Sequence, residues 1–436
     1  MMNENFNKLI NTGVKWLPEI NSKWKIGRVK DLFYISKELS AKNNPIILSL
    51  ARSAVKVRDI SNNEGQLAAS YDNYNSVQVG DLLLNPMDLY SGANCNVSYV
   101  DGVISPAYSN LRAKIQLEPK YYDYYFKTQY WTMAMFAHGK GVSFDNRWTL
   151  NNDVLLNYEV PIVPFNEQQK IVDILNKKVS QIDALILNQE NQIEKLKEYK
   201  QSLITDIVTK GTNKSVAKKN SKIDWIGDIP VHWSITKIKY IGNTQNGISK
   251  SSEYFGHGYP FITYADVYKN YSLPLMPTNL IESNEKEREI FSVKKGDIFF
   301  TRTSETIEEV GFSSVCEETI NNSCFAGFLI RLRPFNMNSK IITLFAKYYF
   351  RSNLTRRFLV KEMNLVTRAS LGQDLLKSMY VLLPPLDEQV EIANYLDEKC
   401  SKIDKLIEVK QSKIEKLQEY KKSIIYEYVT GKKLVD

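Results

Sequence analysis

The sequence predicts an α+β fold class: two similar domains joined by two long helices, which pair as an antiparallel coiled coil in a pseudo-two-fold symmetric arrangement. Three observations lead to this prediction. Residues 164–209 align with residues 385–430 without a gap, and 22 of the 46 aligned positions are identical. A block with two tryptophans opens each half of the chain, and each repeated segment carries apolar residues at heptad spacing.

The length and composition of the chain restrict its class. A chain of 436 residues is too long for one ordinary core and is better divided into two or more domains. The formal charge of +8, from 57 basic and 49 acidic residues, favours a polyanionic partner. The four cysteines form no CxxC pair and the three histidines have no metal-ligand spacing, so neither a metal site nor a disulfide framework is expected. The first residues lack a signal-peptide pattern and no apolar run reaches the roughly 18 residues of a membrane helix, which predicts a cytoplasmic protein without membrane contact.

The tryptophan blocks and the repeated segments form a frame around two different inserts. The stretch "WLPEINSKWKIGRVK" starts at Trp16 and resembles "WIGDIPVHWSITKIK", which starts at Trp225. Inside the inserts, "VGDLLL" at Val79 and "KGDIFF" at Lys295 each predict a turn followed by a buried strand. Each insert is therefore expected to be a compact α+β domain.

The frame also sets the predicted boundaries. A helix is expected after the strands of each insert, near residues 121–136 and near residues 340–352. The predicted segments, in chain order, are a first domain over residues 1–155, a spacer helix over 156–211, a linker over 212–224, a second domain over 225–376 and a second spacer helix over 377–436.

Both repeated segments carry the start and stop signals of a helix. Each follows a proline, with Asn166 or Asp387 expected as the N-terminal capping residue and a glutamate next to it in the first turn. Gly211 and Gly431 lie just past the last apolar residues, where a left-handed C-terminal position favours glycine. About 43 helical residues at 1.5 Å each make a rod of roughly 60 Å.

Steps of three and four residues define an apolar seam along each helix, and the seam of one copy is expected to cover that of the other. Antiparallel pairing is preferred because it relates the two halves by a two-fold axis, near which Gln189 and Lys410 would face each other. The apolar seam residues used for this prediction are Leu175, Ile182, Ile186, Ile193 and Leu196 in the first copy and Leu396, Ile403, Ile407, Ile414 and Leu417 in the second.

The order of these parts resembles that of a known family, the specificity subunits (HsdS) of type I restriction-modification systems. The residues that carry the resemblance are "PFNEQQKIVDIL" and "PLDEQVEIANYL" at the helix starts, and "EKLKEYKQSLI" and "EKLQEYKKSII" further along. The pattern covers nearly the whole chain and is duplicated, which makes it more specific than one short motif.

The resemblance implies a non-catalytic DNA-binding subunit. Its two target-recognition domains would each read one half of a bipartite site in double-stranded DNA, and the helices would set the spacing and dock two modification (methyltransferase) subunits. Restriction and translocase subunits would join them. No cofactor is expected in this chain; S-adenosylmethionine, ATP and Mg are expected in the partner subunits.

Reading of base edges requires polar side chains, and affinity requires cations on phosphates. Groups of these kinds lie on expected loops of both inserts. The DNA-binding candidates are Arg52, Lys56, Arg58, Tyr90 and Asn94 in the first insert and Lys250, Tyr264, Arg302, Thr303 and Arg331 in the second. Arg147 and Arg368 are added because both halves carry them at the same offset, which favours a frame contact or a shared phosphate contact.

Two other classes remain as alternatives. A self-contained DNA methyltransferase is suggested by "NPMD" at residues 85–88, although its third and fourth positions depart from the Asn/Asp-Pro-Pro-aromatic motif and no glycine-rich cofactor loop accompanies it. A turn inside the first insert explains this stretch better. A coiled-coil scaffold that binds only protein is the other alternative, but a scaffold has no need for two different inserts.

Overall fold

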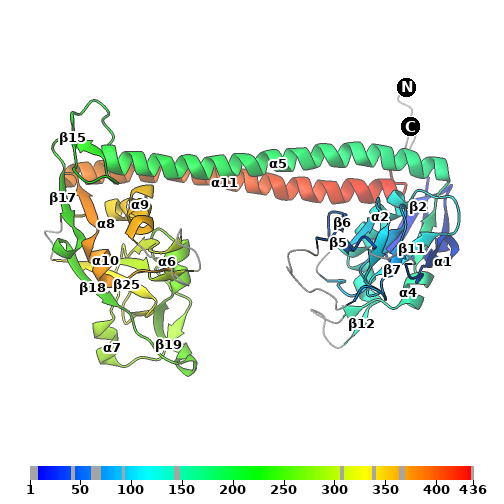
Figure 1. Cartoon of the computed structure of the whole chain (residues 1–436), viewed down its shortest axis with the longest axis horizontal. Helices are drawn as coiled ribbons and strands as arrows, with labels where there is room; N and C mark the ends of the chain where they lie inside the picture. Colours follow the sequence, from blue (N-terminus) through cyan, green and yellow to red (C-terminus); the bar gives the residue numbers. More distant parts are fainter. Residues whose placement is uncertain are drawn as a thin grey trace. The chain divides into compact units, whose positions relative to one another are not determined.

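The computed structural model describes residues 8–40, 45–59, 70–90, 94–141, 148–304, 309–335, 340–362 and 369–433. The chain divides into two compact units, each of which is described by itself. Unit 1 consists of Met1–Glu190 together with Ser412–Asp436, and unit 2 is Asn191–Gln411. The division falls inside both long helices, so each unit contains part of each helix (Figure 1). The predicted spacer helices are thus shared between the compact units.

Unit 1 is built on a four-stranded antiparallel sheet of order β4-β11-β8-β9, formed by Phe33–Ile35, Ser109–Ala113, Leu82–Leu84 and Cys95–Val97. The helix expected after these strands is confirmed as α2, Pro119–Trp131. The remaining pairs of strands are β1–β2 (Leu9–Val14, Leu17–Asn21), β3–β14 (Lys25–Arg28, Glu159–Ile162), β5–β6 (Leu48–Leu50, Val55–Val57), β7–β10 (Asn75–Val77, Gly102–Ile104) and β12–β13 (Lys140–Gly141, Trp148–Thr149). The short helices are α1 (Val29–Leu32), α3 (Ala134–Ala137) and α4 (Asn152–Asn157).

Unit 2 repeats this plan with a sheet of order β18-β25-β21-β23, formed by Gly242–Asn246, Leu329–Pro334, Ile298–Thr301 and Ser313–Val315. The second expected helix is confirmed as α8, Thr343–Tyr349. The other strands are β15–β16 (Lys218–Asn220, Asp228–Pro230), β17–β27 (Ser234–Lys237, Tyr380–Leu383), β20-β19-β24 (Leu280–Ile281, Phe255–Ile262, Cys324–Phe325) and β22–β26 (Thr303–Ser304, Ala369–Ser370). The remaining helical elements are η1 (Ile238–Tyr240), η2 (Ser252–Tyr254), α6 (Tyr264–Lys269), α7 (Glu285–Ile290), α9 (Asn353–Glu362) and α10 (Gln373–Ser378).

Each of the two sheets contains its own buried Asp–Arg ion pair. The comparison of the two halves of the sequence did not reveal these pairs. "VGDLLL" becomes β8 and "KGDIFF" becomes β21, and each strand is third in its sheet, as expected for buried strands. Asp81 before β8 accepts from Arg112 Nε and Nη2 at 2.9 and 2.8 Å, and Asp297 before β21 accepts from Arg333 Nε and Nη2 at 2.6 and 2.6 Å. Both carboxylates are almost fully buried, so each depends on its arginine for the stability of the charge.

Substitution Asp297→Ala is expected to lower the stability of the unit 2 sheet by about 3 kcal/mol, because breaking a buried pair leaves the other charge without compensation. This value is at the low end of the range of about 3–5 kcal/mol for breaking a buried ion pair. The reason is that the Arg333 side chain is 30% exposed and still donates a hydrogen bond to Ser292 O in the variant. Hydrogen exchange of peptides covering β21 and β25 measures the loss. Glu194→Ala is the control, since Glu194 and its partner Lys197 are both mostly exposed and the substitution should leave protection of the sheet unchanged. Equal protection in both variants would contradict a stabilising role for the Asp297–Arg333 pair.

The long helices are α5, Phe165–Lys210, and α11, Leu386–Val429. They begin one residue before the predicted caps, so the assignment of Asn166 and Asp387 as capping residues is wrong and both lie in the first turn. The carbonyl of Pro164 already accepts the first helical bond, from Gln168 at 3.0 Å. Gly211 and Gly431 follow the helices with φ of +75° and +71°, which confirms the left-handed C-terminal glycines. Within the described ranges, no helix has the combination of length and apolar character that crossing a membrane requires.

Each tryptophan block is attached to the first turn of a long helix. The indole Nε1 of Trp24 donates to Glu167 Oε2 at 2.7 Å, and that of Trp233 donates to Glu388 Oε2 at 3.0 Å. The two glutamates predicted to interact with the helix dipole therefore also bind the tryptophan blocks that precede the inserts.

Within each unit the two helices run antiparallel, as predicted. In unit 1, Lys421 of α11 pairs with Asp183 of α5 at 2.6 Å, and in unit 2 the symmetry-equivalent Lys200 of α5 pairs with Asp404 of α11 at 2.7 Å. The apolar contacts agree, because the end of α11 shares a core with the start of α5 in unit 1. All ten predicted apolar seam residues are buried or half-buried.

The expected pairing at the helix midpoints is different in the structure. Lys410 donates to the side chain of Gln192, one helical turn beyond the predicted partner Gln189. Gln189 itself is 6% exposed. A lysine side chain is long enough to bypass the opposite seam position and reach an amide at its edge.

Candidate nucleic-acid interface

The first insert presents its basic candidates on the β5–β6 hairpin. Arg52 lies in the turn and Lys56 on β6, and both are exposed, whereas Arg58 directly after β6 is half-buried. The amide of Asn96 donates to Ala51 O at 2.8 Å and fixes the backbone of this turn. The hairpin therefore places two exposed cationic side chains on an anchored backbone.

Tyr90 and Asn94 both lie in the connection between β8 and β9. Tyr90 is 60% exposed and packs its ring against Phe136 at 6.1 Å between centroids. Asn94 is half-buried, and its carbonyl accepts from the Asn85 amide at 2.8 Å. The Asn85 side chain accepts from the Met87 amide at 3.0 Å, so the "NPMD" stretch forms the turn expected of it.

The candidates of the second insert are more constrained. Lys250 Nζ donates to Glu282 O at 2.9 Å and to Glu287 Oε2 at 2.8 Å, so its charge is paired within the unit. Tyr264 at the start of α6 stacks on Tyr268 at 5.8 Å. The stack covers one face of the half-buried Tyr264 ring.

Arg302 and Thr303 lie where β21 leads into β22. Both are half-buried, and Thr303 pairs with Ser370 across the β22–β26 ladder. The Arg302 amide donates to Phe328 O at 3.0 Å, which fixes its backbone.

Arg331 does not fit the expectation of a base contact. It is 6% exposed, donates to Ser292 O at 2.6 Å and also donates to the side chain of Gln245. Burial lowers the pKa of its guanidinium to about 10. Its guanidinium is thus engaged in contacts within unit 2. Arg147 and Arg368 lie outside the described residues.

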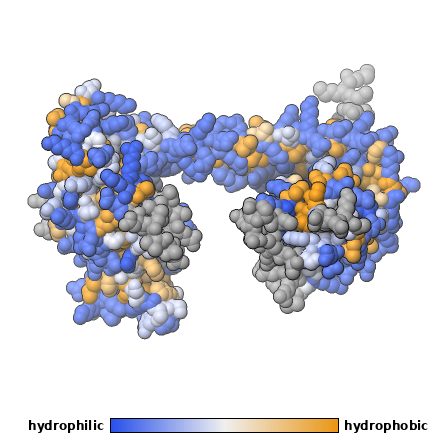
Figure 2. All heavy atoms as spheres, viewed as in Figure 1, coloured by the Kyte–Doolittle hydropathy of each residue, from blue (hydrophilic) through white to orange (hydrophobic). Residues whose placement is uncertain are grey.

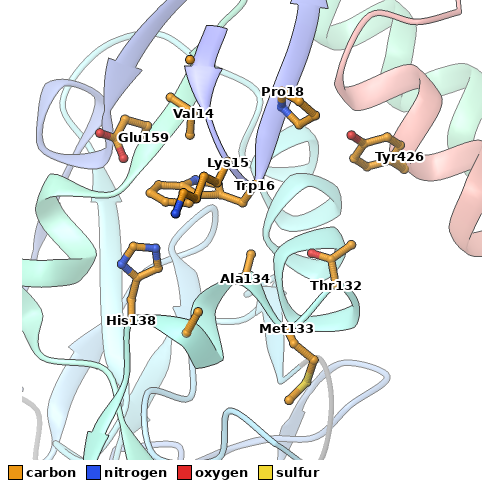
Figure 3. A pocket seen from close by; sticks show the side chains of 12 residues that line it. Val14, Lys15, Trp16, Pro18, Thr132, Met133, Ala134, His138, Glu159 and Tyr426 are labelled. Atoms are coloured by element: carbon orange, nitrogen blue, oxygen red, sulfur yellow. The ribbon is translucent and has the colours of Figure 1, made fainter.

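A large cavity of ≈ 840 Å³ opens beside the first tryptophan block (Figure 3). Trp16 stacks on Tyr158 at 5.0 Å and meets the edge of His138 at 4.4 Å, with Lys15 and Glu159 also lining the space. The two opposite charges give this cavity no preference for an anion. Within the described ranges, His, Cys, Asp and Glu side chains form no group of three that could hold a metal ion.

A second cavity of unit 1, of ≈ 510 Å³, is strongly cationic and was not found from the sequence. Four of its lining residues follow one face of α2 at steps of four, three and four: Lys120, Tyr124, Lys127 and Trp131. Their helical spacing was the available signal. This spacing could not be assigned to a cavity from the sequence, because the sequence does not show which face of α2 is accessible to solvent.

The fold is thus a duplicated α+β frame that carries two different inserts on paired long helices. The family model for the type I restriction modification DNA specificity domain matches residues 21–195 and again residues 230–419. The chain belongs to this family.

Individual relatives and solved structures agree with this assignment. The EcoBI specificity subunit of Escherichia coli is 22% identical over 422 residues, covering 93% of this chain and 84% of the relative. The EcoKI specificity subunit of Escherichia coli K12 is 25% identical over 256 residues, an alignment that spans 57% of this chain and only about half, 52%, of the relative.

The fold is also similar to two solved chains. One comes from work reported as "Structural basis underlying complex assembly and conformational transition of the type I R-M system", with a TM-score of 0.71, 15% identity and coverage of 95% of this chain and 99% of the other. The HsdS subunit of Thermoanaerobacter tengcongensis has a TM-score of 0.50, 14% identity and coverage of 95% and 98%. At these identities the likeness concerns the fold.

Proposed function

We propose that this chain is the DNA sequence-recognition subunit of a type I restriction-modification complex, in which each unit reads one half of a bipartite site in double-stranded DNA. The observation that carries the proposal is a frame repeated down to single contacts around two inserts that differ. The Trp–Glu bonds at the helix starts occur in both units. Inside the inserts, the Asp–Arg pair of the sheet is also repeated. A repeated frame with different inserts suits one complex that reads two different half-sites.

The exposed side chains of the inserts support DNA as the partner. Arg52 and Lys56 are exposed cations on an anchored hairpin, where they can reach phosphates or base edges. Tyr90, after β8, adds an exposed aromatic ring to the same insert. Lys250 and Arg331 are committed to contacts inside unit 2, so we propose Tyr264, Arg302 and Thr303 as its better candidates.

The long helices are proposed to set the spacing of the half-sites and to dock two modification subunits. Figure 2 shows hydrophobic residues interrupting the hydrophilic surface of these helices. Two exposed apolar positions are the same in both copies: Leu185 and Leu406 are 47% and 51% exposed, and Tyr199 and Tyr420 are 58% and 51% exposed. Unit 1 holds Leu185 and Tyr420, and unit 2 holds the equivalent pair, which supports docking of the same partner on each unit.

In this proposal the chain contributes recognition and its partners contribute catalysis. S-adenosylmethionine is bound by the modification subunits, and ATP and Mg by the restriction and translocase subunits. The Asn85 side chain accepts from the Met87 amide and so supports a turn at residues 85–88, which favours a structural explanation of "NPMD" over a methyltransferase motif.

Reconstitution with the modification subunits tests the proposal. The chain with these subunits is expected to retain DNA in a gel shift and to methylate an interrupted two-part motif, which methylome sequencing of cells with and without the chain identifies. The purified chain alone is expected to transfer no methyl groups. Methylation of an uninterrupted motif, or methyl transfer by the isolated chain, would contradict the proposal, and absence of DNA retention in the complex would favour a protein-only scaffold.

A further inference from the structure

The cationic cavity of unit 1 lies where the first insert meets the long helices. It is lined by the β5–β6 turn, by α2 and by both long helices, which are close together in unit 1 (Figure 1). Its charged lining residues are Arg52, Lys120, Lys127, Lys421, Lys422 and Asp183. Five of these side chains are cationic and one is a carboxylate, so the cavity favours an anion.

Three of the cations are held in place by carboxylates. Asp123, fully buried on α2, pairs with Lys120 at 2.5 Å and with Lys127 at 2.9 Å. Burial lowers the pKa of Lys127 but the charge of Asp123 more than offsets this, so the pKa is raised and the ammonium stays charged. Lys421 is paired with Asp183 at 2.6 Å. These ion pairs neutralise part of the positive charge of the cavity and fix the positions of the ammonium groups.

Arg52 and Lys422 are different. Both are exposed, and among the ion pairs of the described residues neither has a carboxylate partner. The Lys422 ammonium lies 6.0 Å from the centre of the Trp131 ring, which holds it over the cavity. These two side chains are therefore free to bind an anion that enters from the side of the insert.

The equivalent cavity of unit 2 shows that this charge is not a property of the frame. Equivalence follows from Tyr124 and Tyr348, whose hydroxyls donate to Asn176 at 2.8 Å and to Asp397 at 2.5 Å, the same position of the two helix copies. The unit 2 cavity, of ≈ 330 Å³, is lined by three lysines and three carboxylates. The position of Lys422 is occupied by Gln201 in the other helix copy.

We propose that the unit 1 cavity binds a backbone phosphate of the DNA next to the first half-site, with Arg52 and Lys422 as the contacting groups. The inference rests on the proposed function. DNA is favoured over a free phosphate because Arg52 belongs to the same hairpin as the exposed Lys56, so one strand backbone can pass from the insert into the cavity. A phosphate contact carries no sequence information, so the site strengthens binding and positions the duplex without changing the motif.

The test compares Arg52→Gln and Lys422→Gln in the full chain bound to its modification subunits. Fluorescence anisotropy between 50 and 200 mM salt measures DNA affinity. Each substitution is expected to reduce the slope of log K against log salt by about 0.9, equally on cognate and on scrambled DNA, and to leave the methylated motif unchanged. Lys422→Gln reproduces the residue of the other repeat at an exposed position, so the fold should tolerate it.

Lys405→Gln is the matched control, because Lys405 lines the balanced cavity of unit 2 and should not alter the slope. Unchanged slopes in both unit 1 variants, or an equal effect of Lys405→Gln, would overturn the inference. Calorimetry with inorganic phosphate distinguishes the sources: phosphate binding that Lys422→Gln abolishes, without any change in the DNA slope, would assign the cavity to a free anion and refute the DNA contact. Failure of the unmodified complex to bind DNA would instead refute the proposed function, and the inference with it.

Discussion

Replacing residues 25–146 by the corresponding insert of a related specificity subunit is expected to change one half of the methylated motif and leave the other half intact. The reason is that the exposed DNA-binding candidates of unit 1, Arg52, Lys56 and Tyr90, lie within this insert. Each mismatched base pair is expected to cost about 1–3 kcal/mol, so a changed half-site should abolish methylation of the original motif. Methylome sequencing of cells expressing the chimera measures the result.

The chimera should keep the residues that bind the frame. The Tyr121 hydroxyl donates to Val429 O at 2.7 Å at the end of α11, and the Tyr124 hydroxyl donates to Asn176 of α5 at 2.8 Å. The matched control exchanges residues 238–367 of unit 2 and should change the other half of the motif only. A change in both halves from one exchange, or in neither, would show that one unit does not read one half-site.

A fragment ending at Gly211 is expected to form a homodimer that directs methylation to an interrupted palindrome. In the full chain, the start of α5 shares its core with Ile424, Ile425, Tyr428 and Val429 of α11, and the fragment lacks all four. The α5 residues at the equivalent repeat positions are Leu203, Ile204, Ile207 and Val208, which are also apolar. A second copy of the fragment can therefore cover the exposed core, and two identical inserts should read a symmetric site.

Light scattering at micromolar concentration measures the assembly, and methylation with the modification subunits tests the site. The fragment carrying Ile204→Lys is the control: it keeps its own insert and the start of α5 but loses the apolar group needed by the second copy, so it should remain monomeric. A well-folded monomer of the unsubstituted fragment, or methylation of an asymmetric site, would argue against exchange of the helix ends.

The features predicted correctly are those that repeat along the chain. A heptad seam and a glycine after the last apolar residue are local patterns, and a duplication of 46 residues confirms each pattern by a second copy. The capping positions were predicted two residues late, because the carbonyls of Pro164 and Pro385 accept the first helical bonds in place of Asn166 and Asp387. The predicted spacer bounds at residues 156 and 377 were early instead, because β14 and β27 precede the helices.

Sequence alone was enough to predict the duplicated frame, the antiparallel long helices and the family resemblance, because these depend on periodicity and on the order of parts. The availability of each polar group could be found only from the folded structure. Arg331 and Arg52 are the same residue type in insert positions, yet one is 6% exposed and hydrogen-bonded inside a sheet while the other is exposed in a turn. Likewise the lysines of α2 and α11 form one cavity only because residues about 300 positions apart in the chain pack together in unit 1. Whether a charge is available to DNA depends on burial and on neighbouring counter-charges, and both are set by contacts between distant segments.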